Sequence, residues 1–181
     1  MRLSILICSL VNRHRELKSL LEVLHKQVGS ADGVEVLIDV DDGCLKVGEK
    51  RNKLLDLAQG EYVCFIDDDD IVPEYYVLKI IAAIATKPDA VGFMGEIEFK
   101  NGKKFPVEYR HGNEDAFDGH TYYRGIWHLQ PVKRTIALQA KFPAKVNRGE
   151  DKCFADQVKL LIETAVFIPE TMYYYKAAYD Q

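Results

Sequence analysis

Residues 58–70 read AQGEYVCFIDDDD, in which a glycine, an apolar run and four consecutive carboxylates follow one another. We expect Tyr62–Ile66 to be a buried strand, because short apolar runs rich in aromatic and β-branched residues are typical of strands in parallel sheets. Asp67–Asp70 would then lie at the carboxyl end of that strand, where open α/β sheets bind ligands. The stretch therefore predicts an α/β fold with an acidic site at one edge of the sheet.

Two similar units precede this stretch. Residues 3–8 and 34–38 are apolar runs that predict strands, and the second run is followed by an acidic loop at 39–43. Apolar residues spaced three and four apart predict a helix after each strand, over about residues 17–28, 54–58 and 77–84. Three strand–helix units predict an open sheet with right-handed crossovers.

The second half of the chain has a different pattern. Residues 91–99 and 103–110 flank Asn101-Gly102, which predicts a β-hairpin. The remaining expected elements are a short helix after Pro131, a helix over about 154–161, and two terminal strands at 165–168 and 172–176, with Tyr173–Tyr175 in an edge strand. No repeat or linker divides the sequence, so residues 1–181 are expected to form one domain.

Composition excludes several classes of protein. With 24 basic and 28 acidic residues the net charge is −4, which gives no general attraction for nucleic acid. The four cysteines lack the spacing of zinc fingers or disulfide scaffolds, which indicates a reduced, cytoplasmic protein. The apolar stretch 3–11 has no cleavage site and is too short to span a bilayer, so we expect no transmembrane segment. Peripheral membrane contact through local patches stays open.

The four adjacent negative charges of Asp67–Asp70 need a compensating positive charge. Two like charges about 4 Å apart repel by roughly 1 kcal/mol in water and about 4 kcal/mol at an effective dielectric of 20. In an extended backbone Asp67 and Asp69 would share one face, with Asp68 and Asp70 on the other. Such paired carboxylates favour a divalent metal, Mg²⁺ or Mn²⁺, bound together with substrate phosphates. The alternative is a solvated turn in which Asp70 caps the helix after Pro73.

Four segments, in this order, resemble family 2 glycosyltransferases of the GT-A fold: LSILICSLVNR at 3–13, GEKRN at 48–52, the stretch 58–70, and GED at 149–151. The similarity extends over about residues 3–176. It implies a Rossmann-like open mixed sheet flanked by helices, with 1–90 as the nucleotide-binding half and 91–181 as the acceptor and catalytic half. It also implies an inverting, metal-dependent enzyme of the hexosyltransferase type. The donor would be a nucleotide-sugar, with a UDP-sugar favoured, and the acceptor a hydroxyl of a saccharide or glycoconjugate.

The resemblance assigns donor binding to the first half. The acid at the end of the second strand would read the base; Asp39 is favoured, and Asp41 stays open because Asp41-Asp42-Gly43 imitates the family's commoner motif. Lys50 and Arg51 would face the nucleotide or its phosphates, or else be solvated helix residues. The implied donor-binding set is Ser9, Asp39, Lys50, Arg51, Asp67 and Asp68, and the implied metal ligands are Asp67 and Asp69.

The resemblance also supplies catalytic and acceptor residues. Asp151 matches the family's general base, which takes the proton of the acceptor hydroxyl. Trp127, His128 and Glu150 would contact the acceptor or a phosphate. Simpler interpretations exist: Glu150 and Asp151 as first-turn carboxylates of a helix, Trp127 as a core residue, and His128 as a hydrogen-bonded loop residue.

Two other functions fit parts of the pattern. A non-catalytic module that binds nucleotide-sugars or glycans would keep the fold and lack turnover. A phosphohydrolase with an aspartyl nucleophile would carry its D-x-D after the first strand, which here ends in Ser9-Leu10-Val11. The phosphohydrolase therefore ranks last.

Overall fold

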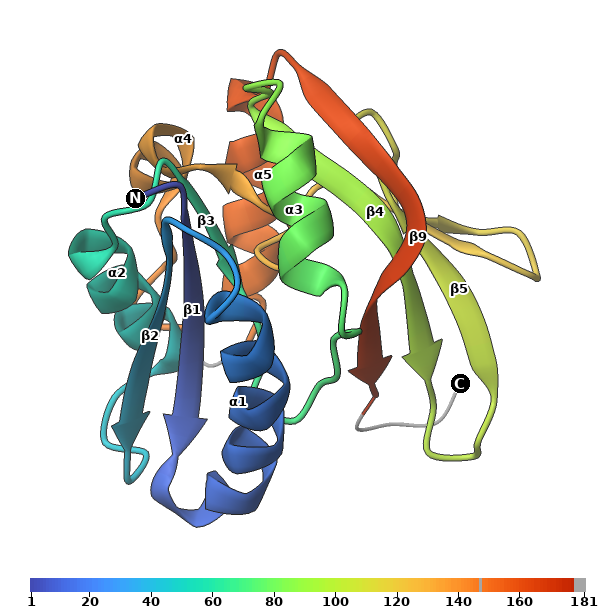
Figure 1. The fold of residues 1–181 in the computed structure, drawn as a ribbon. Helices are drawn as coiled ribbons and strands as arrows, with labels where there is room; N and C mark the ends of the chain where they lie inside the picture. The colour runs from blue at the N-terminus through green and yellow to red at the C-terminus, as the bar shows by residue number, and fades with distance from the viewer. Residues whose placement is uncertain (147, 178–181) are drawn as a thin grey trace.

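The computed structural model describes residues 1–146 and 148–177. Within these residues, nine strands form one mixed sheet that is flanked by five α-helices (Figure 1). The strands are β1 (Leu3–Leu10), β2 (Val34–Asp41), β3 (Tyr62–Phe65), β4 (Ala90–Glu98), β5 (Lys104–Tyr109), β6 (Ala116–Phe117), β7 (Tyr122–Arg124), β8 (Val132–Lys133) and β9 (Ala165–Lys176). The helices are the 3-10 helix η1 (Val11–Arg13), α1 (His14–Val28), α2 (Val47–Leu57), α3 (Tyr76–Ile84), α4 (Arg134–Ala140) and α5 (Glu150–Leu161). The predicted open mixed α/β sheet is confirmed.

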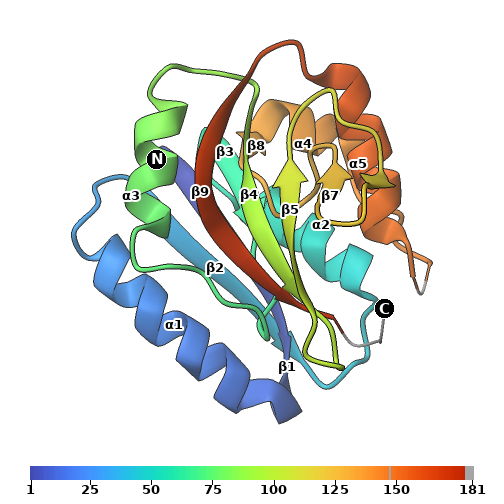
Figure 2. The same ribbon diagram turned by 90° about the vertical axis from the view of Figure 1, so that its right-hand side faces the viewer.

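The sheet has a parallel part and a mixed part. Its strand order is β2-β1-β3-β8-β4-β5-β7-β6, and β9 pairs with β4 outside this path. β1 is parallel to both β2 and β3, so the carboxyl ends of these three strands meet at one edge. β8 is antiparallel to β3 and β4 and connects them to the long curved strands β4, β5 and β9, which Figure 2 shows side by side.

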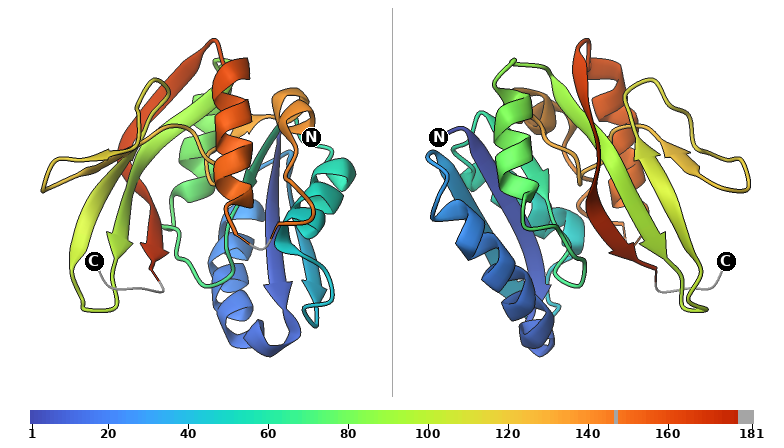
Figure 3. Two further views of the ribbon diagram at one scale, coloured as in Figure 1. Left: turned by 180° about the vertical axis from the view of Figure 1, so that it is seen from behind. Right: turned by 45° about the vertical axis from the view of Figure 1, so that its right-hand side comes forward.

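Helices cover both faces of the sheet. α1 and α3 pack on one face, and α2, α4 and α5 pack on the other, as the two views of Figure 3 show. Side chains of β1 alternate between the two cores, with Ile5 and Ile7 in the first and Leu6 in the second. Because both faces of β1 are buried, the strand is apolar along most of its length.

The glycine of the opening stretch is required by a close approach of two chain segments. A Cβ atom at Gly60 would lie 2.5 Å from the backbone nitrogen of Ser4. The Gly60 N–H donates to Ser4 Oγ at 2.8 Å. Gly60 therefore brings the start of β3 close against β1.

Two predicted strand boundaries are wrong. β2 continues to Asp41, so Asp39 and Asp41 lie in the strand and not in a loop after it, and Asp39 is the ladder partner of Cys8. Residues 165–176 form one strand, not two. Register shifts between Phe93 and Gly95 let β9 follow β4 without a break.

The hairpin and the terminal strand position the later residues of the site. β4 and β5 are antiparallel, as predicted, and Gly102 in their turn has φ of 81°. Tyr173 in β9 is 0% exposed, so it is a core residue and not only part of an edge strand. Within residues 1–146 and 148–177, the other side of β9 makes one isolated bridge, from Tyr174 to Ile71.

All four cysteines have free thiols. Among residues 1–146 and 148–177, none of the helices combines the length and the apolar composition that crossing a membrane requires.

Candidate active site

The four carboxylates after β3 form a turn, which we call the acidic turn (Asp67–Asp70). The Asp70 N–H donates to the Asp67 carbonyl at 3.1 Å, so the backbone is folded and not extended as predicted. The side chains of Asp67 and Asp69 are 34% and 44% exposed, whereas Asp68 and Asp70 are buried. The predicted helix cap at Asp70 is wrong, because α3 begins only at Tyr76.

Residues at the end of β1 hold the middle of the acidic turn. Ser9 Oγ donates to Asp68 Oδ2 at 2.5 Å. Arg13 pairs with Asp68 Oδ1 at 3.1 Å and also with Asp69. Burial raises the pKa of Asp68, and the contacts with Ser9 and Arg13 only partly oppose this. Ser9 thus contacts a carboxylate of the protein, and Arg13 is a site residue that the sequence analysis did not select.

The last carboxylate of the turn is held by β9. Tyr173 donates from its hydroxyl to Asp70 Oδ2 at 2.8 Å, and the Lys176 N–H donates to Asp70 Oδ1 at 3.0 Å. Burial, and then the charge of Asp67, raise the pKa of Asp70 to about 7. Asp70 therefore fixes the turn to the C-terminal strand and does not act as a helix cap.

Arg51 lies inside the protein on α2 and is 4% exposed. Its guanidinium donates to Asp67 Oδ1 at 3.0 Å, to Glu150 Oε1 at 2.9 Å and to His128 Nε2 at 3.1 Å. Since a guanidinium only donates, His128 Nε2 is the acceptor. The alternative of a solvated Arg51 is wrong. In this structure Arg51 faces carboxylates of the protein, where the resemblance implied phosphates.

Burial and charge act in opposite directions in this group. Burial would raise the pKa of Asp67, but the charge of Arg51 outweighs it and holds that pKa below its usual range. Burial would lower the pKa of Arg51, but Asp67 and the neighbouring acids raise it. Burial, and then the charge of Arg51, lower the pKa of His128, so the imidazole is neutral. The repulsion within the acidic turn is therefore already reduced by Arg51 and Arg13, without a metal.

Lys50, the neighbour of Arg51, points toward β1 and β2. It is 3% exposed, and its ammonium donates to the Ser9 carbonyl and to Asp41 Oδ1, the latter at 2.6 Å. The solvated alternative for Lys50 is therefore wrong as well. The hydrogen bond from Lys50 is the largest effect that lowers the pKa of Asp41.

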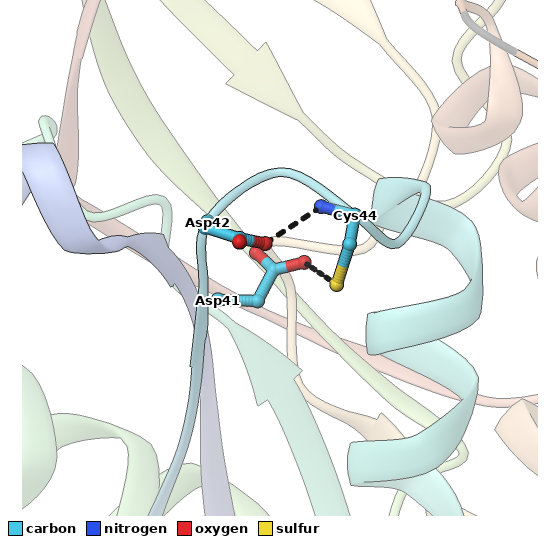
Figure 4. A group of neighbouring side chains, drawn as sticks. All are labelled: Asp41, Asp42 and Cys44. Atoms are coloured by element: carbon cyan, nitrogen blue, oxygen red, sulfur yellow. Dashed lines mark hydrogen bonds between the residues drawn. The ribbon is translucent and has the colours of Figure 1, made fainter.

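Asp41, Asp42 and Cys44 form a compact group after β2 (Figure 4), with one candidate ligand atom from each lying within 4.8 Å of the others. Their atoms bond to one another and to the loop: the Cys44 N–H donates to Asp42, and Cys44 Sγ donates to Asp41 Oδ2. Asp41 Oδ2 also accepts the Leu45 N–H at 2.9 Å. Both carboxylate oxygens of Asp41 are thus engaged.

Asp39 differs from Asp41 in this respect. Its Oδ1 accepts a hydrogen bond from Lys53 at 2.8 Å, while its Oδ2 is buried and has no partner among the described residues. An unpaired buried acceptor costs free energy, and an N–H donor from a ligand would satisfy it. Of the two acids left open by the sequence, Asp39 is the one with an acceptor to offer.

Of the cavities that border the acidic turn, two meet at Asp67. The first, which we call the turn cavity, has a volume of about 450 Å³ and is lined by Ser9, Arg13, Lys50 and Asp67–Asp69. The second, the aromatic cavity, has a volume of about 200 Å³ and is lined by Tyr109, Tyr122, Trp127, His128 and Asp151. Asp67 and Tyr175 line both cavities. The structure thus brings Ser9, Lys50, Asp67 and Asp68 of the predicted donor set to one cavity, and Asp151 and Trp127 to the next. Asp39 and Arg51, the other two members of that set, line neither cavity.

The residues of the GED segment have different surroundings. Asp151 is in the first turn of α5 and lines the aromatic cavity. Glu150 is buried, pairs with Arg51, and lines neither cavity. Gly149 before them has φ of 81°, a backbone conformation that favours glycine. The segment therefore places two adjacent acids on different sides of one helix turn.

Trp127 and Arg124 share one wall of the aromatic cavity. The Arg124 guanidinium lies 5.1 Å from the centre of the Trp127 ring. Sequence reasoning missed Arg124 as well as Arg13, Tyr173 and Tyr175. Only Arg13 had a usable signal, because a cation that directly follows β1 must lie at the same sheet edge as the acidic turn.

The oxygens of Asp67 and Asp69 fit a divalent cation in chemistry and in access. Both line the turn cavity, next to Lys50. Mg²⁺ and Mn²⁺ prefer carboxylate oxygens and are held through one or two of them together with phosphates. Asp69 now pairs with Arg13, so a cation there would compete with that guanidinium.

A family model described as "Glycosyl transferase family 2" matches residues 45–148, which is more than half of the chain. The chain belongs to glycosyl transferase family 2. The predicted membership is confirmed, and with it the class of enzyme, a glycosyltransferase. The match includes Lys50, Arg51, the acidic turn, Trp127 and His128. Among the curated proteins, none matches this family 2 chain.

Solved structures of TarS from S. aureus share the GT-A-type fold of this family 2 chain. The TarS crystal structure matches with a TM-score of 0.76 and 18% identity, covering 98% of this chain and 37% of TarS. TarS 1–349 in complex with UDP-GlcNAc matches with a TM-score of 0.73 and 16% identity, covering 100% of this chain and 60% of that one. TarS 1–349 in complex with UDP matches with a TM-score of 0.75 and 18% identity, covering 98% of this chain and 61% of that one. The chain thus spans less than two thirds of each of these TarS chains, and at this identity the likeness shows the fold alone.

Proposed function

We propose that this family 2 chain transfers a sugar, with inversion, from a UDP-sugar to a hydroxyl of a saccharide or glycoconjugate acceptor. One observation carries the proposal. A cavity with basic and acidic walls joins a cavity with aromatic walls at Asp67, and Asp151 lines the second cavity. A nucleoside diphosphate fits the first environment and a sugar the second. The solved complexes of TarS with UDP-GlcNAc and with UDP support this choice of donor.

In the proposed complex the turn cavity holds the nucleotide. Lys50 and Arg13 face its phosphates, because both cations line this cavity. Asp39 lies behind the cavity wall as the ladder partner of Cys8, and it reads the base through its unpaired Oδ2, since the imino N–H of uracil is a donor. Ser9 lies between Lys50 and Asp68 and fixes the cavity wall.

Asp67 and Asp69 would hold the Mg²⁺ or Mn²⁺ ion. When bound, such an ion neutralises charge that develops on the departing diphosphate. Arg13 releases Asp69 when a cation binds and becomes free to pair with a phosphate. Asp68 stays fixed by Ser9 and forms part of the donor wall.

The aromatic cavity holds the reacting sugar. Its tyrosines and Trp127 provide apolar faces on which a sugar ring packs. The acceptor hydroxyl attacks the anomeric carbon from the side opposite the diphosphate; the new C–O bond forms, the bond to the diphosphate breaks, and Asp151 takes the hydroxyl proton. One displacement of this kind inverts the anomeric centre.

The same proposal covers the organisation of the chain. Ser9, Lys50 and the acidic turn come from the nucleotide-binding half (1–90), and Trp127 and Asp151 from the acceptor half (91–181) of one domain. A cytoplasmic site of action remains a prediction from the free thiols.

The proposal is tested with a panel of UDP-sugars and saccharide acceptors in the presence of Mn²⁺, with released UDP as the signal. Asp151→Asn should lower turnover by about 10²- to 10⁴-fold, the usual contribution of a general base, while UDP affinity stays near that of the wild type. Asp156→Asn is the matched control, because Asp156 lies on the same helix and pairs with the exposed Lys152. UDP binding without any transfer or donor hydrolysis would instead select the non-catalytic binding module.

A further inference from the structure

Arg51 connects three segments that are far apart in the sequence. Its two terminal nitrogens bond to Asp67, which is 16 positions away, to His128, which is 77 positions away, and to Glu150, which is 99 positions away. Glu150 is the first residue of α5, and the next residue in the helix is Asp151. The guanidinium thus bonds on one side to the acidic turn and on the other to the helix that carries the proposed base.

Aromatic rings hold the guanidinium in place. Arg51 Cζ lies 5.8 Å from the centre of the Phe65 ring and 5.3 Å from that of Phe142. Phe142 in turn stacks on Phe154 of α5, with ring centres 4.2 Å apart and planes 3° apart. Polar and apolar contacts therefore lead from Arg51 to the same helix.

Arg51 is separated from the substrate space. It is 4% exposed and lines neither the turn cavity nor the aromatic cavity. Its charge is met by Asp67 and Glu150, at 3.0 and 2.9 Å. Its Nε has no partner among the described residues, but this atom is buried as well, so Arg51 directs no exposed donor at a diphosphate in either cavity.

We propose that Arg51 is a positioning residue that joins Asp67 to Glu150 and thereby holds Asp151 across the aromatic cavity from the acidic turn. The role given to Asp151 rests on the proposed function. The link itself rests on the contacts of Arg51. Arginine suits this task because its planar fork donates in two directions at once, whereas a lysine ammonium is a single point on a flexible stem.

Glu150 separates the two effects of the link, because replacing it leaves the Arg51–Asp67 pair intact. We expect Glu150→Ala to lower kcat at least tenfold while the dissociation constant of UDP, measured calorimetrically with Mn²⁺, changes less than threefold. Glu150→Gln keeps an acceptor oxygen for Arg51 and should recover most of the lost kcat. Asp156→Asn, the control on the same helix, should leave both quantities unchanged.

A second measurement does not depend on turnover. Hydrogen exchange in the first turn of α5, where the Cys153 N–H donates to the Gly149 carbonyl at 3.0 Å, should become at least about fivefold faster in Arg51→Lys and Glu150→Ala, and not in Asp156→Asn. If the wild type transfers no sugar at all, the proposed function fails and this measurement still tests the link.

Three results would overturn the inference. The first is unchanged exchange in both Arg51→Lys and Glu150→Ala. The second is a loss of UDP affinity in Glu150→Ala as large as the loss of kcat, which would make the pair part of the donor contact. The third is a Glu150→Gln enzyme as slow as Glu150→Ala, because a retained acceptor should restore the position of Asp151.

Discussion

The Tyr173 hydroxyl donates to Asp70 Oδ2 at 2.8 Å, and the oxygen of that hydroxyl accepts the backbone N–H of Asp67 at 3.0 Å. One phenol on β9 therefore holds the first and last residues of the acidic turn. Tyr173 is fully buried, so water cannot replace either bond if the hydroxyl is removed. The shape of the turn depends on a strand that is remote in sequence.

Tyr173→Phe is expected to lower the free energy of unfolding by about 1–3 kcal/mol, because it removes the partner of the Asp67 N–H and of one buried carboxyl oxygen of Asp70. Urea denaturation measures this loss. Tyr174→Phe is the matched control, since the next side chain along a strand points to the opposite face and Tyr174 is partly exposed. Equal stabilities of the two variants would show that the hydroxyl of Tyr173 does not hold the turn.

Arg13→Gln is expected to strengthen the binding of Mn²⁺ in the absence of nucleotide. The substitution removes a cation that pairs with Asp68 and Asp69, and one unit charge at about 4 Å is worth roughly 1 kcal/mol in water, or about fivefold in affinity. Electron paramagnetic resonance of free Mn²⁺ measures the change. Arg15→Gln is the control, because Arg15 is exposed on α1. A weaker or unchanged affinity in Arg13→Gln would contradict a metal at Asp69.

Asp39→Asn and Asp41→Asn distinguish the two candidate base readers. Uracil presents an N–H where cytosine presents an acceptor, so loss of a carboxylate acceptor at Asp39 should reduce the preference for UDP over CDP by about tenfold or more. Asp41→Asn removes the charge that pairs with Lys50 and should lower the affinity for both nucleotides by the same factor. Calorimetry with the two diphosphates gives the ratio. A ratio that changes only in Asp41→Asn would assign the base to Asp41.

Asp89 should make stability depend on pH in the acid range. Its carboxylate accepts bonds from Lys133 at 2.8 Å and from the N–H groups of Glu163 and Thr164 at 3.0 and 2.9 Å. The hydrogen bond from Lys133, and then those from residues 163 and 164, hold the pKa of Asp89 below its usual range. The stabilisation is therefore present above the unfolded pKa, roughly 3.9, and is lost as the pH falls further through the folded pKa.

We accordingly expect Asp89→Asn to be less stable than the wild type by about 1–3 kcal/mol at pH 7, with the gap closing as the pH falls below about 4. Denaturation curves over this range measure the gap. Asp56→Asn is the control, because Asp56 makes only an exposed pair with Lys141. A gap that stays constant with pH would show that the charge of Asp89 does not contribute.

Periodicity was enough to predict most of the elements. Apolar runs identified β1, β2 and β3, and Asn101-Gly102 identified the β4–β5 hairpin, because these signals are local. The ends of β2 and β9 could not be predicted from the local sequence, because they depend on pairing with other strands. β2 continues through Asp39 and Asp41 because Cys8 and Leu10 of β1 are their ladder partners. β9 stays paired with β4 along its whole length because the register between the two strands shifts near Met94.

The sequence predicted which residues belong to the site better than it predicted the contacts between them. The strand pattern predicted the acidic turn at the edge where the carboxyl ends of the parallel strands meet, and the family resemblance added Lys50 and Asp151 to that site. The sequence could not show that adjacent residues on α2 point to different partners, with Lys50 toward β1 and Arg51 toward α5. Those partners depend on the tertiary packing, as does the contact between Asp70 and Tyr173.

The contact between Asp70 and Tyr173 joins residues 103 positions apart, so the ribosome makes the acidic turn long before it makes the tyrosine that holds it. Arg13 and Arg51 are already present when the turn emerges, whereas Tyr173 follows only with β9. Domains generally begin to fold from the N-terminus during synthesis. The acidic turn can therefore take the shape described here only after β9 has docked beside β4.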